Sequence, residues 1–282
     1  MRSPRQIKRL CALSDEKLFC STAEGINLII ENAQTYLRAA ESLIQRAPGR
    51  AVEHLRLTAE EEAAKVLILL DAVRCPSSAV HDKDRSRTLG YFRDHLARGV
   101  YALYSCSRPA TFKETVRFVH SACQDRYYDG PVGDEFECRN WIESRREESL
   151  YVDYVEDDGK CYWVSPSNLI EVGQHIGYSM VLDLAEALWR LGCGTADGVR
   201  IVADVWRPIL VSESSSADLD WPSYAQHNFR TVECLGDAGL SKNATDADFR
   251  LVFDAWNYPL YSLDFYKMRT TARPSDDDII EI

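Results

Sequence analysis

Charged residues at helical spacing are the first feature of this sequence that could carry chemistry. Glu62 belongs to the stripe at positions 55, 59, 62, 66, 69 and 73, where an ionised carboxylate among apolar residues needs a partner. Lys65 follows three residues later, so an ordinary intrahelical salt bridge worth about 0.3–0.5 kcal/mol would explain the pair. A polar cluster held between helices is the functional alternative.

His95 and Arg98 lie one helical turn apart, so their side chains share a face. An imidazole beside a cation suits metal-independent RNA cleavage. In that reaction one group deprotonates the ribose 2′-hydroxyl and a cation stabilises the charged phosphorane. A half-buried histidine beside a solvated arginine is the plainer alternative.

Arg145 and Arg146 stand just before a predicted strand, and Tyr151 follows them. Arginine binds phosphate in a bidentate manner, and a tyrosine hydroxyl can orient the same group. The two arginines could equally pair with Glu147 and Glu148 at the surface.

Nine cysteines are scattered along the chain without a Cys-x-x-Cys pair, which is typical of free thiols in a reduced compartment. A zinc site could use Cys106, His120, Cys123 and Cys138, although only His120 and Cys123 have compact ligand spacing. The sequence has no phosphate-binding loop with a lysine, no dinucleotide fingerprint and no serine-hydrolase elbow. We therefore expect no metal and no other cofactor, with the zinc site as the alternative.

The composition favours a globular protein, because 45% of the 282 residues are apolar and 27% are charged. A formal charge of −11 argues against a surface that coats nucleic acid, so any RNA contact must be confined to a small basic site. The longest apolar runs, such as Val66–Leu70, are much shorter than the roughly 20 residues of a membrane-spanning helix. No apolar stretch of signal-peptide length occurs near the N-terminus, so we expect a cytoplasmic protein.

Apolar periodicity predicts the helices that must position these residues. A capping-box pattern at Ser21 opens a helix to about residue 44, and a second helix at about 51–74 should pack antiparallel to it. Further elements are expected as helices at about 88–105, 111–123 and 165–191, a turn-rich segment at 125–133 and a β-hairpin at 150–164. Weaker helical signals near 197–206 and 246–256 indicate an appended C-terminal lobe.

Four short motifs follow one another in order: Asn32-Ala33, Glu61-Glu62-Ala-Ala-Lys65, Phe92-Arg-Asp-His95-Leu-Ala-Arg98, and Arg146 leading to Leu150-Tyr151-Val152-Asp153. Together they resemble the AbiV family of bacterial abortive-infection proteins, which is similar to the HEPN superfamily of helical ribonucleases and toxins. The resemblance covers about residues 20–192. Arg98 stands where the family more usually has a lysine.

The resemblance implies a mainly α fold, a HEPN-like four-helix up-down bundle that often forms a homodimer with a composite cleft. The domains expected are an N-terminal extension at 1–20, the bundle at 21–194 with a small β-hairpin insertion inside 109–164, and a C-terminal lobe with an acidic tail at 195–282.

The resemblance also implies an anti-phage defence effector that acts on RNA or translation. We expect a metal-independent endoribonuclease in which His95 is the general acid or base, Arg98 and Arg146 hold the scissile phosphate, and Glu62 and Tyr151 assist. Lys65 and Arg145 are the further RNA-binding candidates. The alternative is a non-enzymatic helical protein that binds a phage or host protein and so triggers growth arrest.

One departure concerns the ribonuclease signature of the wider superfamily, an arginine and a histidine separated by four to six residues in one helix. Only Arg74 and His81 have this spacing here, and Pro76 interrupts them. Arg146 and Tyr151 have an allowed spacing with tyrosine in the place of the histidine. A cleaving His95 would therefore have to come from a different segment than its arginine.

Overall fold

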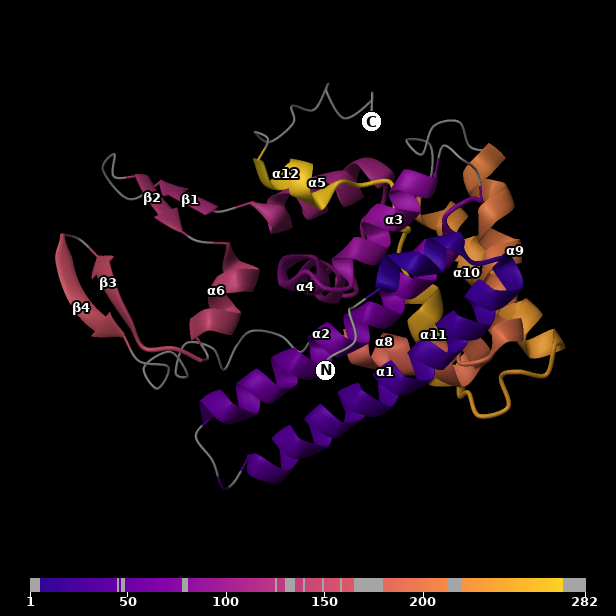
Figure 1. Ribbon diagram of the computed structural model, residues 1–282, viewed down its shortest axis with the longest axis horizontal. Coiled ribbons are helices and arrows are strands. Elements are labelled where there is room, and N and C mark those ends of the chain that lie inside the picture. Colours follow the sequence, from indigo (N-terminus) through magenta and orange to yellow (C-terminus); the bar gives the residue numbers. More distant parts are fainter. Residues whose placement is uncertain are drawn as a thin grey trace.

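A pair of long antiparallel helices forms the centre of the fold. The computed structural model describes residues 6–44, 46, 49–77, 81–124, 126–129, 135–138, 140–148, 150–157, 159–164, 180–212 and 220–270. Helices α1 (Asp15–Leu43) and α2 (Gly49–Arg74) lie side by side in Figure 1. With 29 and 26 residues, they are about 43 and 39 Å long at about 1.5 Å per residue.

Helix α2 is the central element because its C-terminal half is buried on every side. Ala63, Ala64 and every residue from 66 to 74 are buried. Helix α1 covers one face, and the other faces contact α3 (Asp82–Tyr91), α4 (His95–Tyr104), α8 (Val181–Leu188) and α9 (Ala196–Ser212). A helix that is apolar around its whole circumference needs neighbours on all sides. The expected mainly α, HEPN-like bundle is confirmed.

The first long helix begins earlier than predicted. Ser14 is its N-cap residue, and Asp15 and Glu16 occupy the first turn, where acidic side chains interact favourably with the helix dipole. Leu18 and Phe19 are buried and continue the apolar stripe towards the N-terminus. The predicted start at Ser21 is therefore wrong, because the apolar stripe runs through the capping-box pattern.

The single helix predicted for residues 88–105 is also wrong, because the chain forms two helices there. Helix α3 ends at Tyr91 and α4 begins at His95. Asp94 has an extended backbone, and its Oδ1 accepts a hydrogen bond from the backbone N–H of Ala97 at 3.0 Å. This N-cap starts a new helix and places His95 in its first turn.

The insertion contributes helices and two hairpins beside α4. Helix α5 (Phe112–Cys123) and the hairpin of β3 (Asp153–Asp157) with β4 (Lys160–Val164) agree with the prediction. The turn-rich segment instead contains β1 (Arg126–Asp129), which pairs antiparallel with β2 (Glu135–Cys138). Helix α6 (Trp141–Glu148) lies between the hairpins and α4 in Figure 1, so Arg145 and Arg146 stand on a helix.

The C-terminal residues share the core of the bundle. Helix α9 is followed by α10 (Trp221–Asp237), α11 (Asp246–Ala255) and α12 (Phe265–Thr270). The buried guanidinium of Arg74 pairs with Asp71 and stacks between Trp206 and Trp256, 4.6 and 4.5 Å from their ring centres. This contact joins α2 to the C-terminal region inside one hydrophobic core. The domain division at residue 195 stays a prediction.

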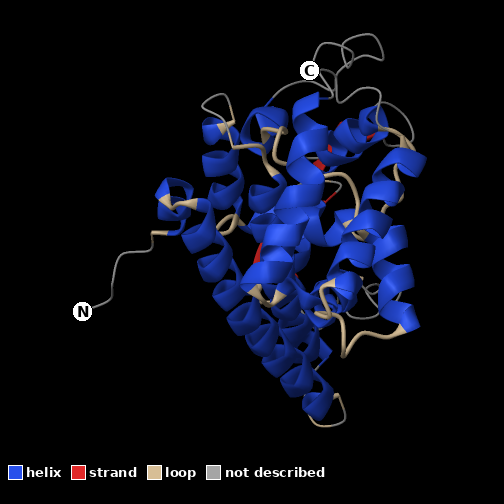
Figure 2. Ribbon diagram, turned by 90° about the vertical axis from the view of Figure 1, so that its right-hand side faces the viewer, coloured by secondary structure: helices blue, strands red, loops and turns tan. Residues whose placement is uncertain are grey.

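Two short irregular helices complete the described chain, which Figure 2 shows to be almost entirely helical. The 3₁₀ helix η1 (Ile7–Ala12) packs against α3, and the π-helical turn η2 (Trp189–Cys193) joins α8 to α9. The helix predicted at 165–191 is described only from residue 180, and the acidic tail at 271–282 lies outside the described residues. Every helix in the described part of the chain is too short or too polar to span a lipid bilayer.

Candidate functional site

The carboxylate of Glu61 is the centre of the candidate site. Its Oε2 lies 2.8 Å from Nδ1 of His95 and 2.9 Å from Nη2 of Arg98. Its Oε1 lies 3.5 Å from Nε of Arg146. Glu61 comes from α2, His95 and Arg98 from α4, and Arg146 from α6. The structure thus brings three of the predicted site residues together around one carboxylate.

A glycine allows α4 and α6 to approach closely enough for this arrangement. A Cβ atom at position 99 would lie 2.1 Å from Cγ2 of Ile142, so only glycine fits on α4 without a shift of α6. Ile142 stands one turn before Arg146 on the same helix. The contact between Gly99 and Ile142 therefore places the guanidinium of Arg146 beside Glu61.

The imidazole of His95 is held through one nitrogen and open at the other. Nδ1 faces both the carboxylate of Glu61, which only accepts hydrogen bonds, and Nη2 of Arg98, which only donates them. In the tautomer that serves the contact with Glu61, Nδ1 carries the proton and the lone pair is on Nε2. The side chain is 46% exposed. Nη2 of Arg98 lies 2.6 Å from the same Nδ1 and donates to it in the other tautomer, in which Nε2 carries the proton.

The surroundings of His95 keep its imidazole neutral. Burial lowers the pKa of His95 below its ordinary value of 6.5, Glu61 opposes this, and the charges of Arg98 and Arg146 lower it further. The neutral form therefore predominates near pH 7 and can accept a proton at Nε2. This is the protonation state that a general base requires.

Two arginines contact the Glu61 carboxylate, and the charges of Glu62 and Asp94 also act on Arg98. The Arg98 side chain is 9% exposed and serves as a fixed charge, whereas that of Arg146 is 35% exposed and can meet a ligand. The cleft between α2, α4 and α6 measures about 30 Å³, the space of a single water molecule. A ligand would therefore meet His95 and Arg146 at their exposed sides.

Glu62 belongs to a different cluster, between α2 and α1. Consecutive helical residues point about 100° apart, so Glu61 and Glu62 face different neighbours. One Glu62 oxygen pairs with Lys65, and the other accepts a hydrogen bond from Nδ2 of Asn32 at 3.0 Å. The ammonium of Lys65 also lies 5.1 Å from the ring centre of Phe92. The structure does not place Glu62 or Lys65 against His95.

The remaining predicted residues lie beside the cluster. Arg145 is bound to acidic residues of α2, with its Nε 3.1 Å from Oε1 of Glu53 and Nη1 4.0 Å from Oε2 of Glu60. The side chain of Tyr151 is 60% exposed and forms no hydrogen bond with a side chain in the described part of the chain. Neither residue contacts the carboxylate of Glu61.

Two residues of this region were not predicted as site residues. The sequence patterns mark Glu61 only as a member of its motif and do not mark His54. Burial and the charge of Arg146 lower the pKa of His54, and Glu61 opposes them, so His54 faces the same cluster. Its Nδ1 is buried without a hydrogen-bond partner among the described residues. The seven-residue spacing of His54 and Glu61, two helical turns, was the signal available in the sequence.

The zinc candidates do not form a ligand set within the described residues, which contain no group of three or more His, Cys, Asp or Glu side chains able to hold a metal ion. His120 and Cys123 are buried, and burial raises the pKa of the Cys123 thiol to about 12. The Cys106 sulfur accepts a hydrogen bond from the backbone N–H of Met180 at 3.2 Å. The side chain of Cys138 lies outside the described residues.

Comparison with known proteins agrees with the helical fold and with the motif order. Neither the curated proteins nor the solved structures contain a significant match to this chain. A family model of the HEPN type, described as AbiV, matches residues 21–189, which is more than half of the 282 residues. The matched segment includes Glu61, His95, Arg98 and Arg146. The chain therefore belongs to the AbiV family of HEPN-like abortive-infection defence proteins.

Proposed function

We propose that this protein acts in abortive infection as a metal-independent endoribonuclease with His95 as its general base. The observation that carries the proposal is the hydrogen bond of 2.8 Å between Nδ1 of His95 and Glu61. A carboxylate that holds one imidazole nitrogen fixes the tautomer and orients the other nitrogen toward substrate. The nearby Arg146, on the second oxygen of Glu61, supplies a cation for the phosphate.

The reaction that these groups support is transesterification of RNA. Nε2 of His95 takes the proton of the ribose 2′-hydroxyl, and the 2′-oxygen forms a bond to phosphorus while the bond from phosphorus to the 5′-oxygen breaks. The products are a 2′,3′-cyclic phosphate and a 5′-hydroxyl, whose proton comes from the resulting imidazolium or from water. Arg146 and Arg98 stabilise the additional negative charge on the phosphorane.

The cellular setting of this proposal follows the family. We propose a cytoplasmic protein that forms a homodimer and is triggered by a phage or host protein. The sequence-based prediction is that Glu62 and Tyr151 assist catalysis and that Lys65 and Arg145 bind RNA. We propose no step of this reaction for these four residues, because the described contacts of their side chains are made away from the Glu61 carboxylate.

The test is RNA cleavage by the purified protein in the presence of a chelator, with His95→Ala and a matched histidine variant. His81→Ala is the matched control, because His81 also faces a carboxylate, that of Asp84 at 3.3 Å, on α3. We expect 2′,3′-cyclic phosphate ends from the parent and from His81→Ala, and a rate about 10²–10⁴-fold lower for His95→Ala. Parent protein that leaves RNA intact, or His95→Ala that cleaves at the parent rate, would overturn the proposal.

A non-enzymatic role is the second candidate, and the β3–β4 hairpin favours it. Tyr154 and Trp163 are cross-strand partners with ring centres 4.9 Å apart, and they are 59% and 68% exposed. Exposed aromatic pairs are typical of surfaces that bind other proteins. If a phage or host protein binds there and binding alone arrests growth, Trp163→Ser abolishes arrest while His95→Ala leaves arrest unchanged.

A further inference from the structure

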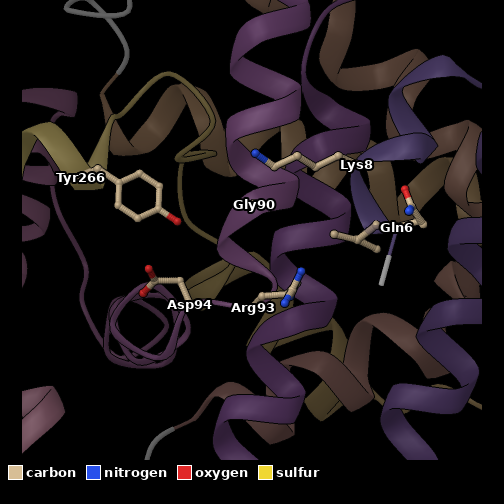
Figure 3. Close-up of a pocket in the computed structure, with 7 residues that line it drawn as sticks. Gln6, Lys8, Gly90, Arg93, Asp94 and Tyr266 are labelled. Atoms are coloured by element: carbon tan, nitrogen blue, oxygen red, sulfur yellow. The ribbon is translucent and has the colours of Figure 1, made fainter. Parts of the chain in front are cut away.

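A cavity beside the candidate site takes no part in the proposed reaction. It measures about 400 Å³ and lies between η1, the end of α3, the start of α4 and α12. Figure 3 shows Lys8 and Arg93 on its border, with Asp94 and Tyr266 on the side of α12. Arg93 and Asp94 directly precede His95 in the chain. A ligand in this cavity would therefore lie next to the start of the helix that carries the candidate base.

The cations at this cavity have no protein partner in the described part of the chain. Lys8 and Arg93 are exposed and form no ion pair with a described carboxylate. The ammonium of Lys8 crosses Gly90 toward the side on which Tyr266 lies (Figure 3), and a Cβ at position 90 would lie only 3.4 Å from it. The carboxylate lining this cavity, Asp94, is already used as the N-cap of α4.

A second cavity continues the first along α3. It measures about 470 Å³, shares Lys8 and Tyr266 with the first cavity and adds Lys83 and Asp82. Arg87 also lines it but is bound to Asp84 at 2.7 Å. Lys83 forms no ion pair within the described residues, so Lys8, Lys83 and Arg93 outnumber the two carboxylates that line the same groove, Asp82 and Asp94. In a chain of formal charge −11, this local excess of cations is a feature that RNA binding would need.

Tyr266 adds an aromatic surface between these cations. It is 51% exposed, and its ring centre lies 5.6 Å from that of the buried Tyr91, which supports it from behind. A hydrogen bond with Asp94 contributes to raising the pKa of the Tyr266 hydroxyl, after burial and the charge of Asp94. An exposed ring held in place between cations is suited to stacking with an unpaired base.

We propose that the groove of Lys8, Lys83, Arg93 and Tyr266 binds single-stranded RNA and leads it to His95. The three cations contact successive phosphates, and Tyr266 stacks on a base. The inference rests on the proposed function and names its substrate as unpaired RNA. A duplex presents no free base face to Tyr266, so it lacks the stacking contact.

Binding of a short, labelled 2′-O-methyl RNA to the full-length protein tests the groove, because this probe has no 2′-hydroxyl and stays intact whether or not the protein is a nuclease. With about 0.7 counterions released per phosphate contact, three contacts predict an affinity loss of about 20-fold between about 50 and 200 mM salt. Arg93→Gln removes one contact, which lowers the affinity about 8-fold at about 50 mM and reduces the salt effect to about 7-fold. Tyr266→Ala weakens binding at least about 5-fold, and Tyr266→Phe does not.

The matched control is Lys242→Gln, which removes an exposed lysine in the loop between α10 and α11. Equal affinities for Arg93→Gln and Lys242→Gln, or no binding by the parent, would refute the groove. Inorganic phosphate or a mononucleotide that binds as tightly as the RNA would show a small-anion site and refute the RNA assignment. Binding that depends on Arg93 in a protein that leaves ordinary RNA intact would refute the nuclease and retain the groove.

Discussion

The neighbouring glutamates of α2 provide the sharpest test of the site. Glu61 and Glu62 are adjacent and their side chains are equally buried, each 15% exposed. Glu61 contacts His95, Arg98 and Arg146, whereas Glu62 contacts Lys65 and Asn32 on another face of the helix. Substitution of either residue by glutamine removes one charge and keeps the shape of the side chain. The two variants therefore separate a role in the site from an effect of charge on helix α2.

The structure predicts different costs in stability for the two variants. Glu61→Gln leaves the guanidinium of Arg98, 9% exposed, without its carboxylate, and weakens the better-solvated contact with Arg146. A charge-assisted hydrogen bond of this kind contributes about 1.5–3 kcal/mol, so we expect the free energy of unfolding to fall by about 2–4 kcal/mol. Dividing this loss by an unfolding entropy of about 0.6 kcal/mol/K, the value for a chain of this size, gives a decrease in Tm of about 3–7 °C. Glu62→Gln loses one intrahelical pair, about 0.5 kcal/mol or about 1 °C.

The difference in activity should be larger than the difference in stability. The amide of the Glu61→Gln variant can present either its oxygen or its NH2 group to Nδ1 of His95 and carries no charge to stabilise the imidazolium, so kcat/KM for RNA cleavage should fall about 10²–10⁴-fold. Glu62→Gln should stay within about threefold of the parent. The assay is initial-rate cleavage of a fluorogenic RNA well below the Tm of both variants, with circular dichroism to confirm folding. Equal rates for the two variants would show that Glu61 does not orient a base.

Three further variants test the electrostatics and packing around the site. Arg146 lowers the pKa of His95, so Arg146→Gln should raise that pKa and move the acid limb of the pH–rate profile to higher pH; an unchanged limb would contradict the contact. Arg74→Met leaves the buried carboxylate of Asp71 without its cation, although Tyr101 and the Leu260 N–H still donate to it, and should lower the free energy of unfolding in urea by about 3–5 kcal/mol; a smaller loss would show that water reaches Asp71. Gly99→Ala should displace α6 and lower the cleavage rate, and Ile142→Ala in the same chain should restore it. A fully active Gly99→Ala variant would show that the close contact between α4 and α6 is not needed to position the site.

The long helices could be predicted because their stabilising contacts repeat along the sequence. The apolar stripes of α1 and α2 span several turns, so the antiparallel pair follows from periodicity alone. The break between α3 and α4 depends on one side chain, the Asp94 cap, and the apolar pattern continues through it. Helix α10 was missed because its polar residues outnumber its buried ones, and tertiary contacts such as the hydrogen bond from Asn228 to Trp256 help to hold it.

The choice between Glu61 and Glu62 could not be made from the sequence, for a geometric reason. The predicted stripe through position 62 is real, and it faces α1. A second face of α2, turned by about 100°, is also covered, because α4 packs on it and Arg145 and Arg146 of α6 reach it. A single apolar stripe predicts one buried face for a helix, whereas a helix at the centre of a bundle, such as α2, is buried on several faces. The apolar run of Ala63, Ala64 and residues 66–70 already indicated such a helix, and on that indication both glutamates were equal candidates.

The close approach of α6 was equally hidden, because it depends on the absence of a side chain. Gly99 carries no apolar signal, and its partner Ile142 is 43 positions away in the sequence. Helical spacing relates residues within one element, whereas the Glu61 cluster joins residues of separate elements across a contact that only glycine permits. For that reason a search of a sequence for an arginine and a histidine in one helix does not find His95 and Arg146. In this chain the two side chains meet through the carboxylate of a third helix.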